Sequence, residues 1–258
     1  MIDQIKEIYQ YREMIRTMIH RDLRGRYKNS VLGFFWTFLN PLLQLGVYTI
    51  VFSIILRAGI EKYYLFLFVA LIPWMFFATS VQGGATCILA HKDMVTKIHF
   101  PRQVLPIAHV TTCFVNMLLC LIVVLLVCLF SVGLNLMALP FLIPVMITEY
   151  LLALGMCFIV SGATVYFRDL EHIIGIVVML WQFMTPIMYS IELVPEELQD
   201  VFMLNPMTPI IVCYRDILYY RQIPQLETLF ASAGIGILLL LVGWFLFNRL
   251  QRRFAEEL

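Results

Sequence analysis

The chain has 258 residues, of which 61% are hydrophobic and 14% charged, with a mean hydropathy of +0.87. Soluble domains are about 45–50% apolar and about 25% charged, so this composition excludes an ordinary cytosolic domain and a disordered chain. The 18 basic and 17 acidic residues give a net charge of +1, which argues against a basic nucleic-acid-binding protein. Because about 20 apolar residues span a bilayer, we expect an all-α integral membrane protein with six transmembrane helices.

The first 33 residues are predicted to form a cytoplasmic amphipathic helix and the approach to the first span. Ile5, Ile8, Ile15 and Ile19 recur at near-helical spacing, and basic residues lie between and after them. This pattern is typical of a helix that lies in the membrane interface. The alternative is a solvated helix that packs on a partner protein.

Charge-free runs locate six spans within a transmembrane domain predicted over residues 34–251. The uncharged stretch 103–148 is too long for one crossing, and Gly133, Asn135 and Pro140 predict the break within it. The expected spans are about 34–56, 63–81, 105–132, 139–166, 173–190 and 228–247.

Residues 191–227 are too many for a simple turn and include four prolines. Their apolar pieces at 201–204, 210–213 and 217–220 are too short to cross a membrane, which favours re-entrant or interfacial helices on the outer face. A flexible outer loop is the alternative. Residues 252–258 are expected to form a short cytoplasmic tail.

The basic residues of the connecting segments predict the orientation of the chain. Of the 18 Lys and Arg residues, 14 lie in the N-terminal segment, the second and fourth connections and residues 248–258, whereas 4 lie in the other connections. Cytoplasmic segments carry the excess of Lys and Arg, so both termini are expected on the cytoplasmic side of the membrane.

The sequence offers little catalytic chemistry. None of the five Lys residues follows a glycine, so the phosphate-cradling G-x-x-x-x-G-K-[ST] motif is absent. The six cysteines form no C-x-x-C pair and are expected to act as small hydrophobic residues, with no metal site or bound cofactor. Glu149 lies well inside an apolar stretch, where a carboxylate has either a hydrogen-bonded structural role or a substrate contact.

The connection after the second span is a short segment of mixed charge. Residues 89–101 place Met94, Val95 and Ile98 on one helical face, beside charged neighbours. Such a face can dock on a cytoplasmic partner. An ordinary loop is the alternative.

Several motifs resemble those of type-2 ABC exporter permeases, and more narrowly those of the polysaccharide exporters for O-antigen, capsule, teichoic acid and rhamnan. The most specific motif is RGRYKNSVLGFFWTFLNP at residues 24–41. Weaker matches follow in order: IPWMFF at 72–77, YFRDL at 166–170, TPIMY at 185–189 and NPMTP at 205–209. The resemblance covers the chain from about residue 22 onward.

This resemblance implies that the chain is half of a transporter. Two copies of the permease pair with two separate ATP-binding subunits, so ATP and Mg²⁺ bind to the partner and not to this chain. The N-terminal helix and the loop after the second span contact those subunits, and a lipid-linked glycan passes outward through a channel lined partly by aromatic side chains. The candidate ATPase-coupling residues are His91, Lys92, Asp93, Met94, Val95, Ile98, Arg168 and Asp169.

Two further sets of candidate residues follow from the implied function. Aromatic rings stack on the apolar faces of sugars, and cationic groups at headgroup level attract a lipid pyrophosphate. The alternatives are an interfacial aromatic belt and simple positive-inside anchoring. The pyrophosphate candidates are Arg24, Arg26 and Lys28. The channel-lining candidates are Phe34, Phe35, Trp36, Trp74, Phe76, Phe77 and Tyr189.

Two other functions are open on the sequence. An ABC exporter of another lipid or of a drug has the same general design, although the aromatic-rich motifs favour a polysaccharide. A membrane-embedded glycosyl- or phosphosugar-transferase needs acidic clusters on cytoplasmic loops to hold a metal-bound sugar nucleotide. Those loops offer only Asp93, Asp169 and Glu171.

Overall fold

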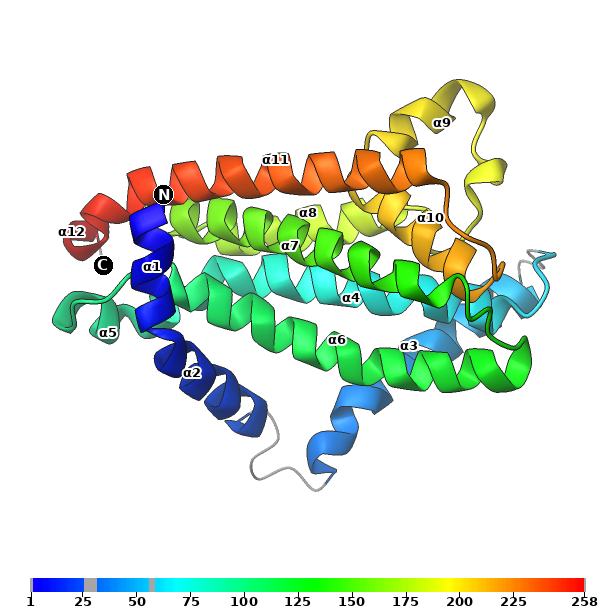
Figure 1. Ribbon diagram of the computed structural model, residues 1–258, viewed down its shortest axis with the longest axis horizontal. Coiled ribbons are helices and arrows are strands. Elements are labelled where there is room, and N and C mark those ends of the chain that lie inside the picture. The colour runs from blue at the N-terminus through cyan, green and yellow to red at the C-terminus, as the bar shows by residue number, and fades with distance from the viewer. Residues whose placement is uncertain (1, 26–31, 56–58, 258) are drawn as a thin grey trace.

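The computed structural model describes residues 2–25, 32–55 and 59–257. Long helices lie side by side in one bundle, and both ends of the chain lie at the same end of it (Figure 1). The helices of the bundle are α3 (Trp36–Thr49), α4 (Tyr63–Cys87), α6 (Val104–Ser131), α7 (Leu142–Thr164), α8 (Leu170–Met184) and α11 (Leu226–Leu250).

Five helical stretches of the described residues are long and apolar enough to cross a membrane. They overlap the first four expected spans and the last one, with shifts at their ends. The helices also break between the third and fourth expected spans, where the chain turns at Gly133, whose φ is +78°. The five stretches are Trp36–Ile55, Tyr63–Cys87, Val104–Ser131, Leu139–Thr164 and Leu226–Arg253.

The centre of the bundle is α4, which packs against α3, α6, α7, α8 and the shorter helix α10 (Met207–Leu218). Of its most apolar window, 78% is buried, against 6% for the first stretch, Trp36–Ile55. A helix that is apolar on all sides suits such a central position. The first stretch ends in a π-helical segment, η2 (Ile50–Ile55), and lies on the outside of the bundle.

The fifth expected span, 173–190, needs correction at its C-terminal end. Helix α8 has 15 residues and ends at Met184, because Thr185 takes an extended conformation, with φ −106° and ψ 131°. The physical reason is Pro186, whose ring disfavours helical geometry in the residue before it. A helix of this length spans only about 22 Å, so residues 185–190 continue the path without helical structure.

Arg215 satisfies the backbone of this non-helical segment. Its guanidinium donates hydrogen bonds to the carbonyl oxygens of Pro186 at 2.5 Å, Ile187 at 2.6 Å and Tyr189 at 3.2 Å. The same group lies 3.6 Å from the ring centroid of Phe66, and the side chain is buried. Backbone carbonyls at membrane depth need such partners, since lipid offers none.

The segment before the last span forms two helices, α9 (Glu196–Met203) and α10 (Met207–Leu218), which meet at an angle of 99°. If this bent pair is counted as one span, the described residues contain six. Helix α10 is buried against α4, α7 and α11, so it differs from a flexible outer loop. It also unites the two apolar pieces expected at 210–213 and 217–220, although it ends at Leu218.

The C-terminal segment packs against the bundle. After α11, the short helices η6 (Gln251–Arg253) and α12 (Phe254–Glu257) turn back toward the chain. The ring of Phe254 is fully buried and lies edge-on to Phe247, with centroids 5.6 Å apart. Tyr166 contacts the other side of this ring at 6.3 Å and donates a hydrogen bond to the carbonyl of Leu250 at 2.7 Å.

Candidate functional site

The candidate coupling segment follows α4 directly. It consists of η3 (Leu89–His91) and α5 (Lys92–Lys97) and lies at the end of the bundle that also holds α1 (Ile2–Gln10) and α12 (Figure 1). Helix α12 contacts α5, so the C-terminal segment supports the coupling helix from one side. The sequence motif therefore forms an ordered helix held by other parts of the chain.

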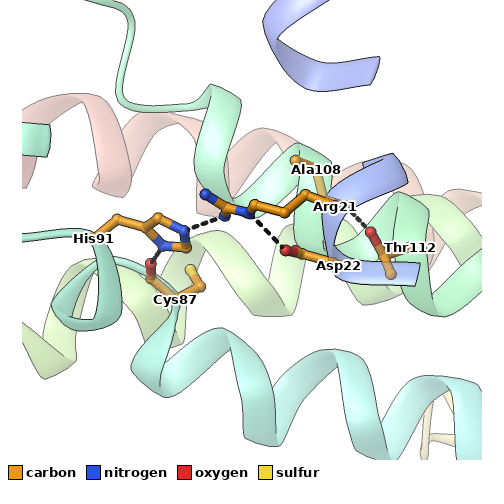
Figure 2. Close-up of polar contacts among 6 residues, drawn as sticks. All are labelled: Arg21, Asp22, Cys87, His91, Ala108 and Thr112. Carbon is orange, nitrogen blue, oxygen red and sulfur yellow. Dashed lines mark hydrogen bonds and ion pairs between the residues drawn. The ribbon is translucent and has the colours of Figure 1, made fainter. Parts of the chain in front are cut away.

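A series of hydrogen bonds connects the N-terminal helices to this segment. Helix α2 (Arg12–Gly25) packs on α6 through the buried side chain of Met18. Near its end, Arg21 donates to Nε2 of His91 at 2.7 Å, and Nδ1 of His91 contacts the carbonyl of Cys87 at 3.0 Å (Figure 2). The tautomer that fits both contacts carries its proton on Nδ1. His91 thus joins α2 to the last turn of α4.

A cavity lies beside these hydrogen bonds, at the junction of α2 and α6. Arg21, Asp22, Gly25, His109 and Thr112 line it, and its volume is about 360 Å³. Figure 2 shows Arg21 between His91 and Asp22, and the Nε of Arg21 lies 3.3 Å from an oxygen of Asp22. At this point polar groups add to the apolar packing of α2 on the bundle.

The structure separates the three apolar residues expected on one docking face. Val95 is only 3% exposed and packs into the core of its own chain. Met94 is partly buried, and Ile98 is 57% exposed. Among these three, only Ile98 is exposed, and Lys92 and Asp93 of the same segment are exposed as well.

The second set of coupling candidates lies in the turn between α7 and α8. Arg168 and Asp169 are both exposed. The carbonyl of Asp169 accepts hydrogen bonds from the backbone N–H groups of His172 and Ile173, which begins α8. Tyr166, just before this turn, packs on Phe254, so the turn lies at the end of the bundle that carries α5 and α12.

Of the three pyrophosphate candidates, the structure places one. Arg24 is exposed in the last turn of α2. Arg26 and Lys28 lie outside the described residues.

The channel-lining candidates fall into two groups. Phe35 is 69% exposed and Trp36 is 37% exposed, and the side chain of Phe34 lies outside the described part of the structure. Tyr189 is partly buried and donates a hydrogen bond to the carbonyl of Phe183 at 2.7 Å.

The other three candidates, Trp74, Phe76 and Phe77, are buried in α4. Phe77 is edge-on to Trp181, with centroids 5.1 Å apart, and Phe76 is edge-on to Phe114 at 5.5 Å. They pack mainly against their own chain, so within one copy they contribute little to an open surface.

Two channel candidates nevertheless meet in one cavity. Trp36 of α3 and Phe76 of α4 line a space of about 150 Å³ between α3, α4 and α6. Asn40, Thr79 and Asn116 supply polar groups to the same cavity. Sequence reasoning missed Asn116, although an amide in the middle of an uncharged run is a usable signal.

Glu149 has the hydrogen-bonded environment that was one of its two expected roles. It is fully buried, and the hydroxyl of Tyr214 donates to its Oε2 at 2.7 Å. Its Oε1 has no hydrogen-bond partner among the described residues. Tyr214 and Arg215 were missed by sequence reasoning, although a cation within an apolar, proline-rich stretch is a visible signal.

Comparison with known proteins identifies the family. The profile described as "ABC-2 type transporter" matches residues 13–219, which is most of the chain. The chain belongs to this ABC-2 type transporter family. Membership, together with the helical bundle, makes it a multi-pass membrane protein and a transport subunit.

Three known permeases are similar to the chain over 95–100% of their length. An O-antigen export system permease protein RfbA of Myxococcus xanthus is 37% identical over 265 residues, covering 100% of both chains. Two RfbA permeases of Klebsiella pneumoniae are 33% and 32% identical, each with 95% of both chains covered. The described residues contain no group of three or more His, Cys, Asp or Glu side chains suited to a metal ion.

Proposed function

We propose that this chain is the membrane permease of an ATP-driven exporter that carries a polysaccharide out of a bacterial cell. The similarity to three permeases of O-antigen export systems, over 95–100% of each chain, carries this proposal. The aromatic residues exposed near the start of α3 suit the apolar faces of sugar rings.

The proposed transporter contains two copies of this chain and two ATP-binding subunits. ATP and Mg²⁺ belong to the partner, because the chain lacks a phosphate-cradling motif. The substrate is a lipid-linked polysaccharide that moves from the cytoplasmic side outward across the inner or plasma membrane. Both termini are assigned to the cytoplasm from the distribution of Lys and Arg residues.

The end of the bundle that carries α5 is proposed to receive the force of ATP binding. The exposed residues Lys92, Asp93 and Ile98 contact the ATP-binding subunit, with the Arg168–Asp169 turn as a second contact. His91, Met94 and Val95 hold the coupling segment to the bundle from the inside. A push on α5 then moves α4 directly, since only η3 separates these two helices.

A pair of substitutions separates contact with the partner from internal packing. Ile98→Ala removes an exposed side chain, so it is expected to weaken co-purification of the ATP-binding subunit at least tenfold, as for an interface anchor. Export falls with it, whereas the melting temperature stays unchanged. Val95→Ala deletes buried methyl groups and instead lowers the free energy of unfolding by about 1–3 kcal/mol. Normal partner binding and export in the Ile98→Ala variant would remove α5 from the coupling role.

Arg24, Arg26 and Lys28 are proposed to attract the pyrophosphate of the lipid carrier. Replacing all three by Gln tests this role against simple anchoring. Loss of export with normal topology supports pyrophosphate binding, whereas a changed topology shows that the residues act as positive-inside anchors.

A gene-replacement experiment tests the function as a whole. A strain that lacks the gene for this chain is expected to lose its surface polysaccharide and to accumulate the polymer inside the cell. The wild-type gene restores the surface polymer. Unchanged surface polysaccharide with a changed lipid or drug efflux favours the exporter of another substrate. Loss of polymer synthesis, with no internal polymer, favours a glycosyl- or phosphosugar-transferase.

A further inference from the structure

Asn116 carries an unpartnered amide at the middle of a membrane span. It lies near the centre of α6, which runs from Val104 to Ser131. Both its side-chain nitrogen and its side-chain oxygen are buried, and neither has a hydrogen-bond partner among the described residues. A buried polar group without a partner destabilises a protein, so its presence calls for a ligand or another function.

Asn116 is one of the residues that line the cavity between α3, α4 and α6. Trp36 and Phe76 supply aromatic walls, and Asn40 and Thr79 supply further polar atoms. The hydroxyl of Thr79 donates to the carbonyl of Met75 at 2.7 Å, which leaves its oxygen able to accept a hydrogen bond. The cavity therefore combines hydrogen-bonding groups with aromatic surface.

We propose that this cavity binds a sugar residue of the exported polysaccharide, with the Asn116 amide as its central polar contact. A sugar hydroxyl both donates and accepts, so it matches the nitrogen and the oxygen of one carboxamide. The apolar face of the ring packs on Trp36. An acyl chain fills the same volume but leaves the amide unpartnered. This proposal rests on the function proposed above.

A matched pair of variants tests the polar contact. Ala and Ser have nearly the same size, and only Ser keeps a hydroxyl that donates and accepts. In a strain in which this chain is the sole permease, Asn116→Ala is expected to lower the rate of polysaccharide export about tenfold. Asn116→Ser retains export at a level closer to that of the wild-type chain.

Stability distinguishes binding from a structural role. Because the amide of Asn116 has no partner within the described chain, Asn116→Ala is expected to leave the melting temperature of the purified transporter unchanged. Thr111→Val is the control on the same helix. The Thr111 hydroxyl bonds to the carbonyl of Ile107 at 2.7 Å and to the hydroxyl of Tyr150 at 2.9 Å, so its removal lowers the melting temperature.

Photocrosslinking tests contact with the substrate directly. A photoreactive amino acid at Met75, which lines the cavity, is expected to crosslink to the host's own polysaccharide during export. The same amino acid at Ile122 of α6, which is 54% exposed and outside the cavity lining, is expected to give no such product. The crosslink at position 75 weakens in the Asn116→Ala background.

Three results would overturn this proposal while the proposed function stands. Full export by Asn116→Ala means that water or lipid fills the cavity. Loss of export together with dimer dissociation or a lower melting temperature assigns Asn116 to packing or to contact with a second copy. A polysaccharide crosslink of equal strength at positions 75 and 122 shows no preference for the cavity. If the wild-type chain itself restores no surface polysaccharide, the proposed function fails first, and the proposal falls with it.

Discussion

Close packing between α7 and α11 allows a sharp prediction about a single methyl group. The two helices pack against each other, and their backbones lie close together at Gly155 of α7 and Gly243 of α11. A Cβ atom added at Gly243 would lie 2.3 Å from the backbone oxygen of Gly155. Small residues permit such an approach of two backbones in a membrane, and Gly243→Ala removes that freedom.

The expected cost of Gly243→Ala follows from this geometry. Ordinary contact begins near 3.4 Å, so the helices must separate by about 1 Å, because the obstructing atom belongs to a backbone. Forcing extra volume into a packed interior typically costs about 1–3 kcal/mol. Against this, Ala favours a helix over Gly by about 1 kcal/mol. Gly234→Ala, on the same helix, gains that preference without a clash, since nothing lies within 4 Å of its added Cβ.

Thermal unfolding of the two variants in the same detergent measures the difference. For a chain of this size each kcal/mol shifts the melting temperature by about 2–4 °C, so Gly243→Ala is expected to melt roughly 2–12 °C below Gly234→Ala. Gly155→Ala repeats the test from the other helix, because its Cβ would lie 2.6 Å from the backbone of Leu239. Equal melting temperatures for Gly243→Ala and Gly234→Ala would refute the packing argument.

Three further predictions concern buried side chains. Glu149→Ala leaves the hydroxyl of Tyr214 buried without its acceptor and is expected to lower stability by about 1–3 kcal/mol, whereas Glu149→Gln keeps an acceptor and costs less; melting curves of both variants check this order. Arg215→Lys replaces a planar fork, in which two separate nitrogens reach the three carbonyls, by one ammonium whose donors all start from a single nitrogen, so the yield of monodisperse protein on size exclusion should fall; a wild-type yield would contradict the assigned role. Phe254→Ala empties a buried site and is expected to cost about 3 kcal/mol in thermal unfolding, while the exposed Glu256→Ala costs nothing measurable.

The positions of most spans could be predicted because lipid imposes a simple rule on sequence. A membrane helix needs about 20 residues without charge, and a turn residue such as Gly133 indicates where a longer uncharged run is divided into two helices. Long apolar helices lie at the first four expected spans and at the last one. The expected fifth span ends too far along the chain, because residues 185–190 carry no charge. The backbone geometry there is set locally by Pro186, which ends α8 at Met184.

The partners of single side chains could not be predicted from the sequence. Arg215 belongs to an apolar, proline-rich segment, but its carbonyl partners lie 26 to 29 residues away along the chain. Val95 shares a helical face with Ile98, yet the packing of α5 on its own chain buries one and exposes the other. Such outcomes depend on tertiary packing, which helical periodicity does not specify.

The central claim, that this chain is the permease of a polysaccharide exporter, is tested most directly in inside-out membrane vesicles. The vesicles contain the chain with its ATP-binding partner and are supplied with the host's lipid-linked polysaccharide on the outside. Addition of ATP and Mg²⁺ is expected to move the polymer into the vesicle lumen, where an added glycosidase no longer reaches it. Polymer that stays fully accessible to the enzyme while the partner hydrolyses ATP would contradict the claim.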